Sequence, residues 1–268
     1  MKKPLPAKTI ATTVCAAGLL VLAGSVQAAG QTAPGEWQYT ATIYGWYAGI
    51  DGKLNYEGDG GDSDGPSLDA GSVIDNLQMA FMGTLGARKD EWSGLLDVAY
   101  LNLGNKRTAS VGLPGGSSIG ARVDLGLKGW QVGLYGGYNL YQTERANMDA
   151  VAGLRYLYVE TNAKLAINGP LPPSLPDRKL SRNGSVLDGV VGVRGQARIV
   201  ENLFVPYHFD VGAGQSRLTW QAMAGVGYQA SWGDTLLVYR HLEWDEGGDG
   251  LVQNLSFSGP ALALRFHF

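Results

Sequence analysis

The stretch LVQNLSFSGPALALRFHF, residues 251–268, decides the fold of this chain. From residue 262 onward every second residue is large and apolar: Leu262, Leu264, Phe266 and Phe268. The residues between them are small or polar: Ala263, Arg265 and His267. Alternation with a period of two predicts a β-strand with one apolar and one polar face. Because chain ends are usually polar and fray in water, a terminal Phe indicates a non-aqueous neighbour.

This tail resembles the C-terminal strand by which the barrel assembly machinery recognises bacterial outer-membrane β-barrel proteins. It departs from the usual pattern at Ala263, where that pattern has Gly, and at Ala261, where it has a polar residue. The resemblance implies that the assembly machinery is a partner of this chain and that Leu262, Leu264, Phe266 and Phe268 form the assembly signal.

Residues 1–28 have the composition of a secretory signal peptide. Three lysines precede the apolar run 9–26, and Val26-Gln27-Ala28 is a small-residue cleavage site. A membrane-anchoring helix is the alternative, since the run is close to the ~18 residues that a span requires. We predict a signal peptide over 1–28 and one domain over 29–268. The only cysteine, Cys15, lies in the signal peptide, so the mature chain has no disulfide framework.

Composition narrows the class of the mature domain. Removing residues 1–28 takes away three lysines and no acid, so the net charge falls from −3 to −6. Nucleic-acid binding, which requires a concentrated basic surface, is therefore not expected. The chain has 40 glycines, 13 tyrosines and 7 tryptophans, which favours strands and turns. Helices and closed barrels are the two structures that span lipid, so a barrel is predicted, with no cofactor and no metal.

The pattern predicts an all-β, antiparallel up-and-down transmembrane barrel of about ten strands, with eight or twelve also possible. The predicted strands are 36–50, 73–88, 92–105, 118–141, 149–167, 185–200, 203–212, 216–231, 235–245 and 251–268. Long connections at 51–71, 106–117, 168–184 and 245–250 alternate with short turns, as in outer-membrane barrels. A shift of phase near 128–130 suggests a β-bulge.

A soluble β-sandwich or lipocalin-like barrel would show the same alternation with its apolar face inward. Against it, aromatic residues lie near the ends of the predicted strands, as interfacial girdles would: Trp37, Tyr39, Tyr47, Tyr100, Tyr156, Tyr158, Trp220, Tyr228 and Tyr239. We therefore expect the apolar faces to contact lipid and the chain to reside in the bacterial outer membrane, with lipids and lipopolysaccharide as partners.

Several segments resemble a widespread group of uncharacterised, porin-like proteobacterial outer-membrane barrel proteins. They are YGWYAGIDG (44–52), GLLDVAYLNL (94–103), AGLRYLYVET (152–161), LTWQAMAGVGY (218–228), YRHLEWD (239–245) and SGPALALRF (258–266). The resemblance covers most of the mature chain and implies the fold and the location. It leaves the chemistry and the oligomeric state open.

With apolar faces outward, the expected lumen is charged and net basic. The candidate lumen or constriction residues are Arg88, Asp97, Arg122, Asp124, Lys128, Arg155, Asp188, Arg194, Arg198, His208, Asp210, Arg217, Arg240, Arg265 and His267. A ten-stranded barrel is narrow. Two hypotheses follow: a plug of Arg–Asp pairs that braces the wall, or a narrow passive channel whose arginines favour anions.

A membrane-embedded hydrolase or acyltransferase acting on lipid or peptide is the alternative from another class. His208 and Asp210 share one inward face and invite comparison with the omptin proteases. The His-x-Asp order differs, however, and the sequence shows no convincing nucleophile, so no catalytic residue is assigned.

Two loops carry charges that could bind ligands. The loop 59–65 lacks the EF-hand order of acids, so a solvated acidic loop is favoured over a calcium site. Arg178, Lys179 and Arg182 could bind lipopolysaccharide phosphates. The alternative, equally compatible with the sequence, is that they are ordinary surface charges without a ligand.

Overall fold

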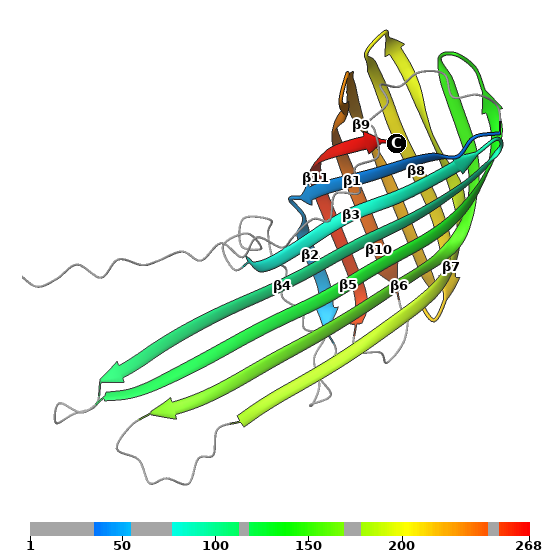
Figure 1. The fold of residues 1–268 in the computed structure, drawn as a ribbon. Helices are drawn as coiled ribbons and strands as arrows, with labels where there is room; N and C mark the ends of the chain where they lie inside the picture. Colours follow the sequence, from blue (N-terminus) through cyan, green and yellow to red (C-terminus); the bar gives the residue numbers. More distant parts are fainter. Residues whose placement is uncertain (1–34, 55–76, 113–117, 169–177, 246–251) are drawn as a thin grey trace, which may run out of the picture.

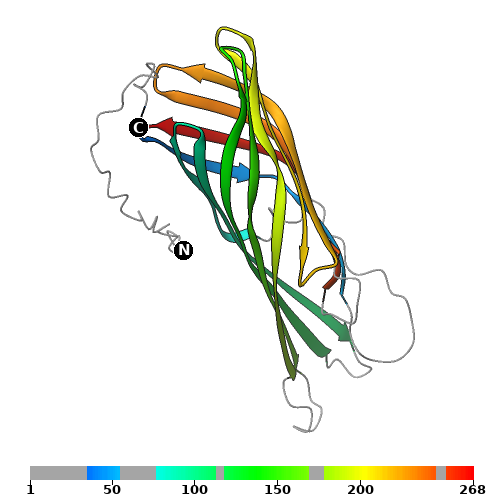
Figure 2. The same cartoon turned by 90° about the vertical axis from the view of Figure 1, so that its right-hand side faces the viewer.

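A computed structural model describes residues 35–54, 77–112, 118–168, 178–245 and 252–268. The predicted signal peptide and the 59–65 loop lie outside these ranges. The strands are β1 (Gln38–Trp46), β2 (Gly49–Leu54), β3 (Leu77–Lys89), β4 (Trp92–Gly112), β5 (Ser118–Gln142), β6 (Ala146–Asn168), β7 (Arg178–Val200), β8 (Leu203–Gly214), β9 (Leu218–Ala230), β10 (Gly233–Asp245) and β11 (Val252–His267). All pairings are antiparallel, and β1 pairs with β11 to close the barrel (Figures 1 and 2). Among the residues described, no helix is long and apolar enough to cross a membrane.

β1 and β2 form one interrupted strand. Their register with β11 is unchanged across the break, with Trp46 opposite Ala261 and Gly49 opposite Ser258. The break is possible because residue 259 is a glycine, since a Cβ there would lie 2.0 Å from the backbone oxygen of Tyr47. With β1 and β2 counted as one, the barrel has ten strands, so the predicted fold class is confirmed.

Two predicted loops are partly wrong. Residues 106–112 continue β4 and residues 178–184 belong to β7, because they pair with β5 and β6 respectively, for example Lys106 with Asp124 and Arg182 with Thr161. The four strands β4–β7 run past the last residues that pair with β3 and β8, so they form a sheet that extends beyond the barrel on its long-loop side (Figure 1).

The predicted bulge at 128–130 is also wrong, because β4 and β5 pair in unbroken register there. Between β5 and β6 the register shifts at Asn139/Tyr141 instead. The phase of the sequence changes for a different reason. Leu127 points into the lumen and packs against an apolar cluster, whereas Trp130 points outward. The inward face itself becomes apolar at this level, so the polarity alternation shifts without a change in the backbone.

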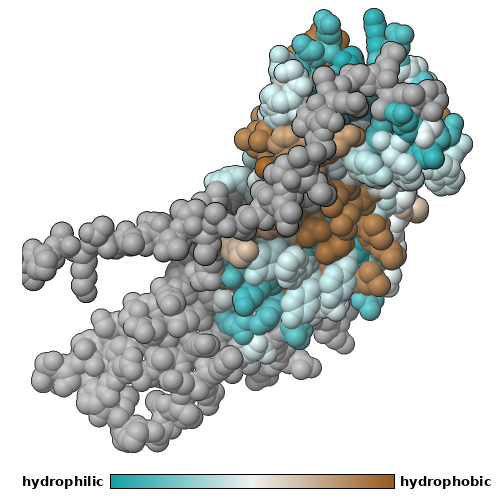
Figure 3. Space-filling model, in the orientation of Figure 1, coloured by the Kyte–Doolittle hydropathy of each residue, from teal (hydrophilic) through white to brown (hydrophobic). Residues whose placement is uncertain are grey.

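The outer surface carries two aromatic belts. Four strands have outward aromatic residues eight positions apart: Tyr39/Tyr47, Trp92/Tyr100, Trp130/Tyr138 and Trp220/Tyr228. Between each pair, the outward positions hold only Ala, Val, Ile, Leu or Gly. Eight residues span about 26 Å of strand, which at a tilt of about 40° approaches the ~25 Å apolar band of transmembrane barrels. Figure 3 shows hydrophobic surface on the barrel wall with hydrophilic residues toward the turn end.

Charge placed in the middle of this band should destabilise the barrel. Leu134 is 56% exposed and lies midway between Trp130 and Tyr138, so Leu134→Arg should lower the free energy of unfolding in lipid vesicles by about 2–4 kcal/mol. Urea unfolding followed by tryptophan fluorescence measures this. Leu140→Arg, on the same strand and face and 57% exposed but beyond the belt, should cost about 0–1 kcal/mol. Equal costs at the two positions would contradict a lipid-facing band.

Candidate functional site

The inward-facing side chains form three successive layers along the barrel axis. Next to the short turns is a cavity of about 350 Å³, which we call the turn-side cavity. Below it lies a charged layer made by Tyr44, Asp97, Gln131, Tyr135, Arg155, His208, Asp210, Thr219, Gln221 and Arg240. Toward the long loops follows an apolar layer made by Ile50, Leu103, Leu157, Val159, Val186, Leu242, Trp244 and Leu255.

One half of the charged layer is centred on Arg240. Its guanidinium donates to Asp97 at 2.7 Å and to Gln221 at 2.6 Å, and it also donates to the hydroxyl of Tyr44 at 3.1 Å. The Tyr44 hydroxyl in turn donates to the other oxygen of Asp97 at 2.7 Å. Trp46 lies under the guanidinium at 4.9 Å. Hydrogen bonds and a cation–π contact therefore hold the buried Arg240 in one position.

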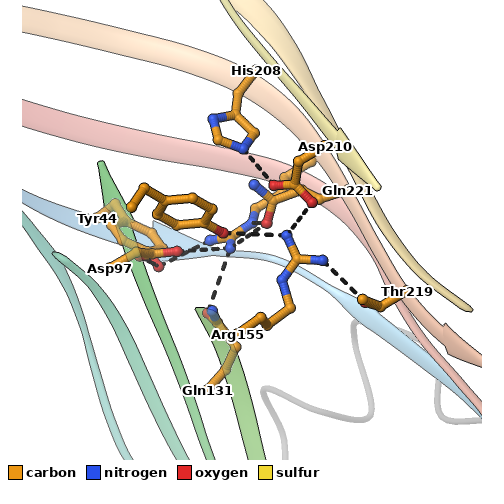
Figure 4. Close-up of polar contacts among 10 residues, drawn as sticks. Tyr44, Asp97, Gln131, Arg155, His208, Asp210, Thr219 and Gln221 are labelled. Atoms are coloured by element: carbon orange, nitrogen blue, oxygen red, sulfur yellow. Dashed lines mark hydrogen bonds and ion pairs between the residues drawn. The ribbon is translucent and has the colours of Figure 1, made fainter. Parts of the chain in front are cut away.

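The other half is centred on Arg155 and Asp210, whose side chains are both 0% exposed. Arg155 donates to Asp210 at 2.5 Å, to Thr219 at 3.0 Å and to Tyr135 at 3.2 Å. His208 contacts the second oxygen of Asp210 at 2.6 Å. Figure 4 shows the two halves side by side, contributed by strands from both sides of the barrel. A buried charge without its partner is costly, so the Arg155–Asp210 pair holds β6 against β8, and the Arg240–Asp97 pair links β10 to β4 across the lumen.

The apolar layer fills the inward face of the barrel on the long-loop side of the charged layer. Trp244 and Leu242 are each 1% exposed, and the Trp244 ring lies 6.0 Å from the guanidinium of Arg155. On β10, the inward residues change from Arg240 to Leu242 and Trp244 within five positions. A hydrated ion that passed the charged layer would thus meet tightly packed hydrocarbon.

The turn-side cavity is lined by charges near its mouth. Arg88 pairs with Asp149, and Arg194 lies 3.6 Å from the same carboxylate while donating to Ser93 at 3.0 Å. On the other side, Asp234 pairs with His267 at 2.9 Å and with Arg265 at 3.6 Å. The side chains of Asp149 and Asp234 are buried, whereas those of the arginines that contact them are partly exposed.

The predicted lumen residues therefore separate into groups. Five lie in the charged layer: Asp97, Arg155, His208, Asp210 and Arg240. Four line the turn-side cavity: Arg88, Arg194, Arg265 and His267. Arg198 lies at the turn-side rim, where it donates to Gln229 at 3.2 Å, and Arg217, 71% exposed, pairs with Asp245 at the opposite rim. The buried Asp188 accepts a hydrogen bond from the backbone of Ser216.

The three remaining candidate lumen residues, Arg122, Asp124 and Lys128, all belong to β5. Lys128 is exposed and lies on the outward face in phase with Trp130, so its assignment to the lumen is wrong. The side chains of Arg122 and Asp124 lie outside the described residues. The sequence reasoning missed the apolar layer, although the phase shift at 128–130 was its signal.

The geometry around His208 fits bracing better than catalysis. Both oxygens of Asp210 are engaged, one by His208 and one by Arg155. Within the described ranges, no serine hydroxyl hydrogen-bonds to His208 and no group of three or more His, Cys, Asp or Glu residues could hold a metal ion. A carboxylate held from both sides fixes the orientation of the imidazole.

A closed antiparallel barrel with paired aromatic belts and an apolar outer band defines a transmembrane β-barrel of the bacterial outer-membrane type.

No family model and no curated protein matches this chain. Similar solved structures include the attachment invasion locus protein Ail of Yersinia pestis in complex with the heparin analogue sucrose octasulfate, with 13% identity over 87% of this chain and 99% of that chain and a TM-score of 0.35. The translocator domain of the autotransporter NalP from Neisseria meningitidis has 14% identity over 89% and 90% of the two chains and a TM-score of 0.40. The Ralstonia pickettii toluene transporter TbuX has 12% identity over 88% and 90% and a TM-score of 0.29. Similarities this low carry no inference about this chain, so its class rests on its own strands and surface.

Proposed function

We propose that this protein is an integral barrel of the bacterial outer membrane whose lumen is closed, with a structural role and no passive channel. The observation that carries the proposal is the Arg155–Asp210 pair, fully buried and covered on the long-loop side by Trp244. A narrow anion-preferring channel would require a continuous polar path past the arginines. The apolar layer argues against such a path.

The proposed orientation places the short turns and both ends of the barrel in the periplasm and the long connections outside the cell. The predicted signal peptide would export the chain, the C-terminal strand would be read by the barrel assembly machinery, and the aromatic belts would contact outer-membrane lipids. Arg178, Lys179 and Arg182 belong to the part of β7 that extends beyond the barrel, where lipopolysaccharide phosphates would be within reach.

A membrane-embedded hydrolase or acyltransferase is less well supported. The His208–Asp210 pair is buried, 4% and 0% exposed, within a wall-to-wall hydrogen-bond network. In that setting His208 contributes to bracing.

Chloride-limited swelling tests the closed lumen. Vesicles containing the refolded mature chain are placed in isotonic KCl with valinomycin, so that they swell only where chloride also crosses. The expected rate equals that of protein-free vesicles, with heat-modifiable gel migration showing that the barrel is folded. Swelling that rises with the amount of folded protein would contradict the proposal.

A further inference from the structure

With the lumen closed as proposed above, on which this inference rests, the turn-side cavity is a pocket open at one end. Its mouth is formed by residues at the turn ends of their strands, among them Gln38, Arg88 and His267, and its floor by Asp97, Tyr135 and Arg240 of the charged layer. At about 350 Å³ it falls at the small end of the ~300–1,000 Å³ range of small-molecule sites. A pocket of this size accommodates a short ligand and excludes a long acyl chain.

The walls of the pocket differ in chemistry. The wall from β9 to β11 carries an apolar patch of Met223, Leu236, Val238, Ala261 and Ala263, with Gln221 and Arg240 at the floor and Arg265 and His267 at the mouth. The wall contributed by β3 to β7 carries more polar groups, including Ser93, Asn147 and Gln196 with Arg88 and Arg194. In the strand order β6 lies five places from β11, so the two walls face each other across the lumen.

The arginines near the mouth are more exposed than the aspartates that pair with them. The side chains of Arg88, Arg194 and Arg265 are 27%, 20% and 26% exposed, whereas those of Asp149 and Asp234 are 2% and 5% exposed. Three guanidinium groups against two carboxylates leave one positive charge unbalanced. A ligand entering the pocket would therefore meet donors that are only partly neutralised.

We propose that the turn-side cavity binds a small organic monoanion, a carboxylate on a short hydrocarbon body. The carboxylate would be held by Arg88 and Arg194, because planar guanidinium groups bind carboxylates with two parallel hydrogen bonds. Its single charge matches the one unbalanced positive charge, which a phosphate dianion would exceed. The hydrocarbon body would lie against Leu236, Val238 and Ala263 and gain from leaving water.

The test is calorimetric titration of the mature chain in zwitterionic nanodiscs, with empty nanodiscs subtracted. The probes are hexanoate, 1-hexanol, which has the body without the charge, and acetate, which has the charge without the body. Hexanoate should bind at least tenfold more tightly than either. Undetectable hexanoate binding, or equal binding by acetate or hexanol, would overturn the proposal.

Variants locate the site. Arg194→Gln should weaken hexanoate at least tenfold and leave hexanol unchanged, whereas the charge-matched control Arg217→Gln, at the opposite rim, should bind hexanoate as the unaltered chain does. Ala263→Phe, which fills the pocket from the apolar wall, should abolish binding and serves as a second variant where Arg194→Gln does not fold. Undiminished binding in folded Ala263→Phe would place the ligand elsewhere. If hexanoate does not bind and the vesicles swell no faster than protein-free vesicles, the binding proposal is wrong and the proposed closed lumen is retained.

Discussion

Replacing Asp210 with Ala should lower the free energy of unfolding by about 3–5 kcal/mol, because Arg155 then remains charged and buried without its carboxylate. His208 loses its partner in the same step. Urea unfolding of the refolded barrel, followed by tryptophan fluorescence, measures the loss.

Two variants separate this effect from simple loss of contacts. Arg155→Met/Asp210→Leu removes both charges and should recover most of the loss, since a hydrophobic pair of similar volume is often neutral or stabilising. Arg217→Ala breaks the exposed pair with Asp245 and should cost less than about 1 kcal/mol. The buried network would not brace the barrel if Asp210→Ala cost no more than Arg217→Ala.

Deleting the charged pairs together with the largest side chain of the apolar layer should convert the barrel into a conducting one. The variant Arg155→Ala/Asp210→Ala/Arg240→Ala/Asp97→Ala/Trp244→Ala deletes the two buried pairs together and the largest side chain of the apolar layer. Each arginine is removed with its carboxylate so that no lone charge stays buried. Chloride-limited swelling of vesicles should rise from the protein-free rate to a rate proportional to the folded protein.

The intermediate variants show which layer closes the lumen. Trp244→Ala alone should stay silent because the charged layer above it is intact, and the four charge deletions alone should stay silent because of Trp244 and its neighbours. If the five-residue variant folded and remained silent, closure would have to come from other parts of the barrel. If either partial variant conducted, one layer alone would account for closure.

The barrel itself could be predicted from the sequence because strand alternation is a local signal. Leu262 and Phe268 point outward, 59% and 49% exposed, while Ala261 and Ala263 are buried in the lumen, as the alternation of the tail indicates. The inward parity of Arg155, Asp210 and Arg240 followed from the same rule. Their partners did not, because Arg240 and Asp97 are 143 residues apart and meet only when the barrel closes.

The apolar layer and the long strands were missed for physical reasons. A lumen that becomes apolar over part of its length shifts the polarity pattern just as a bulge would, so Leu127 beside Trp130 is ambiguous from sequence alone. The Gly- and Pro-rich composition of 106–117 and 168–184 predicted loops. Residues 106–112 and 178–184 are nevertheless strand, because pairing with a neighbouring strand outweighs local propensity.

Single-channel recording of the refolded, unaltered mature chain in a planar bilayer tests the closed lumen most directly. The recording needs symmetric KCl, a salt gradient for selectivity, no added ligand, and gel migration as proof of folding. The charged and apolar layers together predict a silent bilayer. Discrete, reproducible openings with anion preference would contradict the closure and make the arginine-lined lumen a channel.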